Sequence, residues 1–260
     1  MHQLFGDGPV TFHSREQEEG VLAVLAAETP VTIVLPTGGG KTLLAMLPVL
    51  IESQGVTIFI APFRALVDDT VTRFRRAGID CFEWTHRQRN PARLVVVSAD
   101  IAVGDGFMTY AGVLAENGLL RRVFVDEGHT IFTDSHWRKN LSHLRQVRSL
   151  PCPMYILTAT LPPQRVSELE ESMAVRTTRI IRASTIRPHH RYCVQHCRPG
   201  TLVDEAVDVA RRQQVHLLRQ KLKGVVYCLS KTQCEELAEQ LGCAHYHAAV
   251  VDRPECLQRW

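Results

Sequence analysis

The fold is indicated most strongly by the segment Leu35-Pro36-Thr37-Gly38-Gly39-Gly40-Lys41-Thr42. The apolar run 31–35 that leads into it predicts a buried strand, and residues 41–53 after it predict a helix. Three glycines between a strand and a helix let backbone amides curl around an anion, and the helix N-terminus adds partial positive charge. The stretch therefore predicts a cradle for the phosphates of a nucleotide.

Two side chains of this cradle carry the expected chemistry. Lys41 can reach the β- and γ-phosphates, and the Thr42 hydroxyl can hold Mg²⁺. The other nucleotide-binding positions are Thr37, Gly38, Gly39 and Gly40. A glycine-rich turn with a solvated lysine is the alternative, and the strand before and helix after the turn argue against it.

A second motif supplies acidic groups, and it is Val123-Phe124-Val125-Asp126-Glu127-Gly128-His129. An apolar strand here delivers two consecutive carboxylates to the carboxyl edge of a parallel sheet, where ligands bind in this architecture. We expect Asp126 to act on the metal through its water shell and Glu127 to polarise the attacking water. His129 is expected to sense the γ-phosphate, although a lone histidine is more often structural.

The remaining chain alternates short β-branched runs with longer helical patterns, which predicts an α/β fold with a mainly parallel sheet. Further strands are expected at residues 56–61, 93–98, 122–125 and 154–157. Helices are expected at residues 65–76, 102–117 and 163–173. In the first of these helices, Leu66, Val71 and Phe74 should face the sheet.

A polar, basic stretch separates this pattern from a second, shorter one. We expect a first domain at residues 1–182, a linker at 183–200 and an incomplete second domain at 201–260. The second domain should contain helices at residues 202–221 and 231–241 and strands at 224–229 and 244–247. Two strands are too few to form a parallel sheet buried on both faces. The chain therefore looks truncated.

Composition excludes several classes of protein. With 260 residues, 45% hydrophobic and 22% charged, the chain is not of the disordered or collagen-like type. A net charge of +3 is too small to argue for nucleic-acid binding by itself. We expect no membrane span and no secretory signal. The eight cysteines are expected to be reduced, and Cys193 and Cys197 beside His196 make only a weak case for zinc.

The order of the motifs resembles superfamily 2 helicases, and within them the RecQ-like group, from about residue 12 to residue 260. Residues 36–42 are similar to motif I, and Asp126-Glu127-Gly128-His129 resembles a DEAH-type motif II with glycine in place of alanine. Ala61-Pro62-Phe63-Arg64-Ala65-Leu66 resembles motif Ia, which touches the DNA backbone, and residues 97–100 sit where motif Ib would fall. Thr158-Ala159-Thr160 is similar to motif III, which links ATP state to strand binding.

Further motifs flank this core. Phe12-His13-Ser14-Arg15-Glu16-Gln17 resembles the adenine-reading motif 0, in which Gln17 would grip the adenine edge and His13 or Arg15 could replace the family arginine. Residues 225–231 with 234–238 resemble motif IV, and residues 245–249 resemble the next motif, with alanine where glycine is usual. The aromatic-rich loop after motif II departs from the family. There Asp134 replaces the expected tryptophan, which Trp137 and Phe132 replace only in part.

The resemblance implies an ATP-dependent 3′–5′ DNA helicase, or a fragment of one, that uses ATP and Mg²⁺. The resemblance implies single-stranded or partly duplex DNA as the partner. It also implies a nuclear location and a role in DNA repair and recombination. Within the group, the sequence is most similar to fungal members. DNA contacts would come from Arg64, Ser98 and Lys231. The later motifs, including the arginine finger, are absent from these residues, so we expect ATP binding without unwinding by this chain alone.

Two alternatives stay open at the level of sequence. A non-catalytic ATP-binding module would share the cradle, and an RNA helicase would share the whole core chemistry. No structural zinc is expected, and Arg73-Phe74-Arg75-Arg76 is interpreted as a helix surface around a core Phe74.

Overall fold

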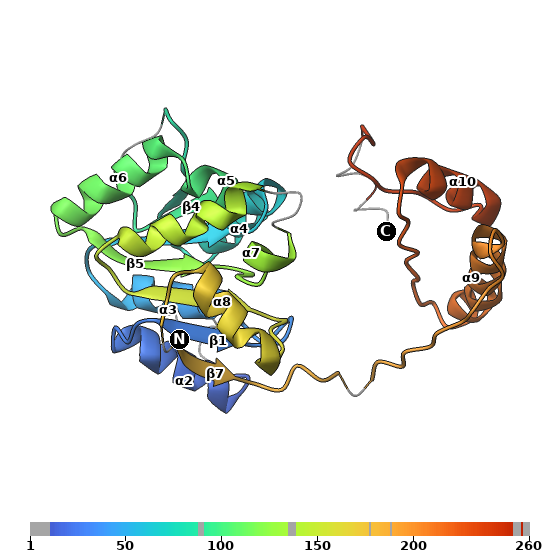
Figure 1. The fold of residues 1–260 in the computed structure, drawn as a ribbon, viewed down its shortest axis with the longest axis horizontal. Coiled ribbons are helices and arrows are strands. Elements are labelled where there is room, and N and C mark those ends of the chain that lie inside the picture. The colour runs from blue at the N-terminus through green and yellow to red at the C-terminus, as the bar shows by residue number, and fades with distance from the viewer. Residues whose placement is uncertain are drawn as a thin grey trace. The chain divides into compact units, whose positions relative to one another are not determined.

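The structure is a computed structural model that describes residues 11–87, 91–134, 139–176, 178–187, 189–251 and 256. The chain divides into two compact units, Met1–Arg187 and Pro188–Trp260 (Figure 1). Among the described residues, no helix is both long and apolar enough to cross a bilayer.

The first unit is built on a seven-stranded sheet in which every pair of neighbours is parallel. The strands are β1 (Val31–Val34), β2 (Val56–Ala61), β3 (Cys81–Glu83), β4 (Leu94–Ser98), β5 (Leu120–Val125), β6 (Met154–Thr158) and β7 (Arg179–Arg182). Their order across the sheet is β3-β4-β2-β5-β6-β1-β7. The fold class expected from the sequence is confirmed, because parallel strands need helical crossovers and two covered faces.

Helices cover both faces of this sheet and bury a separate apolar cluster on each (Figure 1). One face is covered by α2 (Arg15–Leu25), α3 (Lys41–Ile51) and α4 (Arg64–Arg76). The other face is covered by α5 (Ala99–Ala102), α6 (Asp105–Glu116), the 3-10 helix η1 (Lys139–Ser149) and α8 (Val166–Ser172). The short helices α7 (Thr130–Thr133) and η2 (Pro163–Arg165) lie in connections.

Four expectations for the first unit need correction. The helix expected at residues 102–117 begins only at Asp105, because Gly104 is the N-cap of α6, and the separate short helix α5 ends at Ala102. The helix expected at 163–173 begins as the 3-10 turn η2. On α4, Val67 is buried and Leu66 is exposed, so the sheet-facing stripe is Val67, Val71 and Phe74. Strands β3 and β7 were not expected, since both are short edge strands with charged ends.

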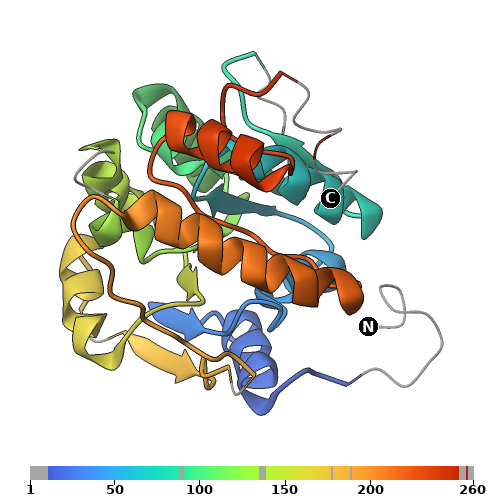
Figure 2. The ribbon, with the colours of Figure 1, turned by 90° about the vertical axis from the view of Figure 1, so that its right-hand side faces the viewer.

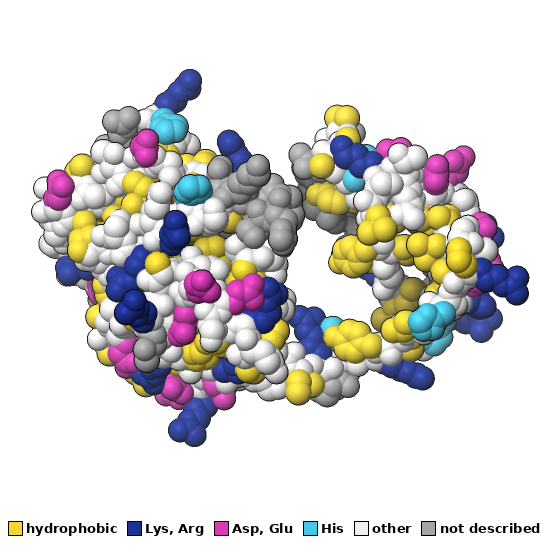
Figure 3. Space-filling view, viewed as in Figure 1, with side chains coloured by type: hydrophobic (Ala, Val, Ile, Leu, Met, Phe, Trp, Pro, Cys, Tyr) yellow, Lys and Arg dark blue, Asp and Glu magenta, His cyan; other side chains and the backbone are white. Residues whose placement is uncertain are grey.

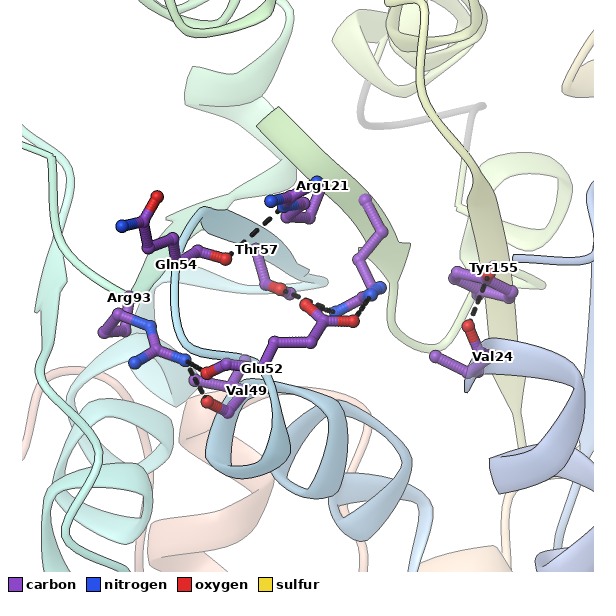
Figure 4. Close-up of polar contacts among 9 residues, drawn as sticks. Val24, Val49, Glu52, Gln54, Thr57, Arg93, Arg121 and Tyr155 are labelled. Atoms are coloured by element: carbon purple, nitrogen blue, oxygen red, sulfur yellow. Dashed lines mark hydrogen bonds and ion pairs between the residues drawn. The ribbon is translucent and has the colours of Figure 1, made fainter. Parts of the chain in front are cut away.

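A polar cluster lies at the amino ends of β2 and β5 and at the end of α3 (Figure 4). Arg122, at the start of β5, contacts the Glu52 carboxylate and also donates to the Thr57 hydroxyl at 3.4 Å. Arg93 donates to the carbonyls of Val49 and Glu52 at the end of α3. Lysine or arginine at a helix C-terminus satisfies its last carbonyls and complements its dipole. The cluster therefore fixes the end of α3 opposite the glycine-rich loop.

Within residues 189–251, the second unit forms the helices α9 (Leu202–Arg219) and α10 (Lys231–Leu241), joined by irregular chain (Figure 2, orange and red). The strands expected at residues 224–229 and 244–247 are not formed in this part of the described chain. An isolated strand without hydrogen-bonded neighbours is not stable in water. The β-branched composition of these residues was therefore not sufficient to predict strands correctly. The apolar side of α9, residues 222–227 and Leu241 line a cleft of about 750 Å³.

Candidate nucleotide-binding site

The motif residues converge at the carboxyl edge of the sheet. The glycine-rich loop follows β1, the acidic turn 126–129 follows β5, and residues 158–160 end and follow β6. Strands β1, β6 and β5 are consecutive neighbours in the sheet, so three segments distant in sequence meet at one edge. This is the position at which ligands bind in open parallel α/β sheets.

The glycine-rich loop leaves the first turn of α3 open. Gly40 is the N-cap of that helix, has φ 77°, and offers no side chain to cap the helix amides. Gly38 has φ 81°, so two of the three glycines adopt the left-handed conformation that other residues rarely reach. The unsatisfied amides and the helix dipole form an anion-binding end. The loop therefore has the geometry of a phosphate cradle.

Lys41 connects this cradle to the acidic turn. Its Nζ lies 3.6 Å from Glu127 Oε1 and 3.4 Å from the Leu35 carbonyl oxygen, with which it forms a hydrogen bond. Both charged side chains are partly buried, so their attraction is screened less than at an open surface. The two motifs read from sequence are thus in direct contact.

Asp126 is the most deeply buried carboxyl group of the site. Desolvation and, after it, the neighbouring Glu127 charge raise its pKa, Lys41 lowers it, and the resulting pKa is about 6. Its Oδ1 is buried and has no hydrogen-bond partner among the described residues. A buried carboxylate oxygen without a partner, at the same sheet edge as the glycine-rich loop, suits a hard cation such as Mg²⁺. The donor set therefore fits the expected metal.

The acidic turn is also tied to the end of β6. Glu127, which has φ 45°, accepts a hydrogen bond at Oε2 from the Ala159 amide at 3.3 Å. His129 Nδ1 lies 2.9 Å from Thr158 Oγ1, and the Thr160 amide donates to that same hydroxyl oxygen at 3.2 Å. Burial lowers the pKa of His129, which favours the neutral ring. Of the three coupling residues expected from sequence, Thr158 and Ala159 thus contact the acidic turn, and Thr160 bonds to Thr158.

Gln17 lies against the glycine-rich loop. It is 1% exposed, and its Oε1 accepts from the His13 amide at 2.7 Å. Its Nε2 donates to the Gly40 carbonyl at 3.4 Å, so the side chain bridges the N-terminal motif and the cradle. Its expected role toward adenine stays a prediction, because both ends of the amide already contact the chain.

The three expected nucleic-acid contacts differ in accessibility. Arg64 is exposed at the start of α4, and Lys231 is exposed at the start of α10 in the second unit. Ser98 is 2% exposed at the end of β4, so its hydroxyl does not reach the surface. Only the two basic side chains are therefore available to a backbone phosphate in this structure.

Sequence reasoning missed one cation at the site. Arg73 was assigned to a helix surface, yet its Nη1 lies 3.5 Å from Thr42 Oγ1, and its Nη2 pairs with Asp69 at 2.7 Å. Its charge also lowers the pKa of Asp126. Its position in α4 was the available signal, because Arg73 lies one helical turn after Asp69 on the side of α4 that faces the first turn of α3.

Histidines also gather in the second unit, where Glu235, His245 and His247 offer ligand atoms within 4.8 Å of one another. His247 Nε2 lies 2.8 Å from Glu235 Oε1, and its Nδ1 accepts from the Ala249 amide at 3.2 Å. A neutral ring that accepts at Nδ1 carries its proton on Nε2, the atom that a metal would need. The contacts therefore describe a hydrogen-bonded group.

Comparison with protein families agrees with the geometry. The family model described as DEAD/DEAH box helicase matches residues 14–169. The chain belongs to this helicase family. The matched residues include the glycine-rich loop, the acidic turn and the end of β6, which are the three segments that meet at the site.

The curated relatives of this helicase-family chain are RecQ-like. RecQ-like DNA helicase blm-1 of Caenorhabditis elegans is 26% identical over 85% of this chain and 24% of its own length. Putative ATP-dependent DNA helicase Q1 of Caenorhabditis briggsae is 28% identical over 94% of this chain and 43% of its own. ATP-dependent DNA helicase hus2/rqh1 of Schizosaccharomyces pombe is 28% identical over 95% of this chain and 20% of its own length. The chain thus spans less than half the length of each.

Solved structures show the same fold. The DUF1998 helicase MrfA bound to DNA and AMPPNP matches with a TM-score of 0.63 and 20% identity, over 87% of this chain and 35% of that one. Dbp5 of S. cerevisiae bound to RNA and ADP BeF3 matches with a TM-score of 0.61 and 13% identity, over 86% of this chain and 60% of that one. At these identities the likeness concerns the fold alone.

Proposed function

We propose that this chain is the ATP-driven part of a RecQ-like DNA helicase that moves along single-stranded DNA in the 3′–5′ direction. The observation that carries the proposal is the contact between Lys41 and Glu127, which joins the cradle to the acidic turn beside the buried Asp126 oxygen. DNA, rather than RNA, is supported by the RecQ-like DNA helicases among the relatives.

Binding is assigned to the loop and the start of α3. The amides of residues 37–40 would surround the phosphates, and Lys41 would exchange part of its contact with Glu127 for phosphate oxygens. Thr42 and Asp126 would hold Mg²⁺, which when bound shields phosphate charge during phosphoryl transfer. Gln17 would add a contact to the adenine while keeping the loop in place.

Hydrolysis and coupling are assigned to the acidic turn. Glu127 would orient the attacking water, because phosphoryl transfer depends mostly on positioning and charge compensation. His129 would report the state of the γ-phosphate to Thr158, whose hydroxyl it already contacts at 2.9 Å. Residues 158–160 would pass that change to the DNA-binding surface. Arg64 and Lys231 would bind backbone phosphates, and a nuclear role in repair or recombination is part of the same proposal.

The experiment that tests the proposal compares ATP hydrolysis with single-stranded DNA, with single-stranded RNA and with neither. We expect stimulation by DNA, and we expect Glu127→Gln to keep ATP binding while losing about 10²–10⁴-fold in turnover, the usual share of a positioned base. Preferential stimulation by RNA would favour an RNA helicase. ATP binding without turnover under any condition would favour a non-catalytic module. Direction of movement is measured on DNA labelled at either end.

A further inference from the structure

The acidic turn lies unusually close to β6. Besides the Glu127 and His129 contacts, the Gly128 amide donates to the Leu157 carbonyl at 3.0 Å. Three consecutive residues of the turn thus bond to three consecutive residues at the end of one strand. Any group that separated the acidic turn from the end of β6 would displace the Glu127 carboxylate and the His129 imidazole together.

Gly128 permits this approach by lacking a side chain. A Cβ atom at residue 128 would lie 2.3 Å from Ile156 Cγ2, which is far inside contact distance. Gly128 does not have a positive φ, whereas Gly38 has φ 81° and open space around its missing Cβ. Glycine is therefore required at 38 by backbone conformation and at 128 by space.

Ile156 cannot yield easily. It lies in the middle of β6, is 0% exposed, and belongs to the apolar cluster on one face of the sheet. Its Cγ2 is bonded directly to Cβ, so it cannot swing aside as the end of a long side chain would. Close-packed interiors transmit such a strain to neighbouring segments. An alanine at 128 would therefore push on the turn.

We infer that Gly128 and Ile156 form a matched pair, in which the missing side chain of one accommodates the branched side chain of the other. Gly128 is thereby a positioning residue that sets where Asp126, Glu127 and His129 stand relative to the cradle. This inference rests on the proposed function of that site. It also accounts for glycine at the third position of the acidic motif, where the DEAH pattern has alanine.

The test uses Gly128→Ala, Ile156→Leu and the double variant, with Gly112→Ala as matched control. A Cβ at residue 112, inside α6, meets no other atom within 4 Å, so the same substitution there adds no strain. Ile156→Leu keeps the core volume but leaves a single γ carbon. Ile156→Ala, which has none, serves as a second partner for Gly128→Ala if the leucine keeps its γ carbon near the turn.

The positioning readout is the ratio of the dissociation constants for a fluorescent ATP analogue in EDTA and in Mg²⁺. We expect Gly128→Ala to lower this ratio roughly tenfold or more, since displacement of a positioned group by about 1 Å can cost about 100-fold. Affinity in EDTA should stay unchanged, because the cradle itself is not moved. A second substitution at Ile156 should restore the ratio to within about threefold of the wild type.

The structural readout is urea unfolding of the wild type, Gly128→Ala, Ile156→Leu and the double variant. Gly128→Ala should destabilise the wild type more than it destabilises the Ile156→Leu protein. An unchanged Mg²⁺ ratio in Gly128→Ala, or a loss that neither Ile156 variant restores, overturns the inference. A wild type that binds no nucleotide overturns the proposed function and the positioning role with it, while the coupling in urea would still report the steric contact.

Discussion

The two units of this chain use similar apolar runs and give them different structures. Residues 31–34 form β1, which is buried because β6 and β7 pair with it on either side. Residues 225–229 have comparable β-branched and apolar content, yet they form no strand, and Tyr227 and Leu229 are 93% and 94% exposed. Strand formation thus depends on partners and covered faces, and composition alone does not secure it.

The same contrast is visible at the surface (Figure 3). On the first unit, charged side chains of both signs are interspersed, whereas hydrophobic side chains gather on the second unit. The exposed apolar residues there include Leu218, Leu222, Val225 and Val226. Because burial of apolar area is the main stabilising contribution to a fold, we expect stability to concentrate in the first unit.

Hydrogen exchange should show the largest difference between the units. Amides of β1, β2, β5 and β6 are bonded in ladders on both sides, whereas residues 222–229 have no ladder. We expect the strand amides to exchange at least about 10³-fold more slowly, since opening them requires global unfolding that costs about 5 kcal/mol or more. Mass-spectrometric exchange measures both regions in one sample. Equal protection would mean that residues 222–229 pair in solution.

Matched Leu→Ala substitutions should separate the units next. Leu94 is fully buried in β4, while Leu229 is almost fully exposed in the second unit. Leu94→Ala should lower the free energy of unfolding by about 2–5 kcal/mol, the range for a buried leucine. Leu229→Ala should change it by less than about 0.5 kcal/mol. Urea unfolding followed by circular dichroism measures both, and similar losses would contradict the expected division of stability.

The affinity for nucleotide should likewise depend on the first unit and not on the second. Lys41→Ala removes the cation of the cradle and its contact with Glu127, so affinity for an ATP analogue should fall roughly 10–100-fold, the value of a hydrogen bond to a charged group. Lys221→Ala removes a lysine at the end of α9 in the second unit and should leave the affinity unchanged. Equilibrium titration with a fluorescent analogue compares the two. Loss of affinity in both proteins would show that the site extends beyond the first unit.

Particular residues show what the sequence could predict and what it could not. The ends of β1 and β5 were predictable, because glycine-rich or acidic residues directly follow apolar runs there, and the end of β6 was indicated by the resemblance of Thr158-Ala159-Thr160 to motif III. The assignment of Leu66 to the core was wrong because one residue of helical phase decides between it and Val67. The missing strands at 224–229 and 244–247 depend on distant pairing, and the roles of Gly128 and Arg73 depend on approach between segments, which no local pattern encodes.

The smallest expected effect concerns pH. Burial raises the pKa of Asp126 to about 6, so its carboxylate is charged above that pH and protonated below it. Metal ligation needs the deprotonated form, and the Mg²⁺-dependent part of nucleotide affinity should therefore fall about tenfold between pH 7.5 and pH 5. Stability should respond in the opposite sense. Because the folded pKa lies above the unfolded value of 3.8, the cost of burying the charge is present above pH 6 and fades as pH falls toward 4.

Asp126→Asn supplies the control, because it keeps the shape of the side chain and removes the titration. In this variant the Mg²⁺-dependent affinity should be low at every pH, and the gain in stability between pH 6 and pH 4 should shrink. Nucleotide titrations and urea unfolding across that range measure the two slopes. If affinity and stability instead fall together on acidification, and do so equally in Asp126→Asn, then Asp126 is not the group that titrates. The acid sensitivity would then belong to the fold of the first unit and not to its site.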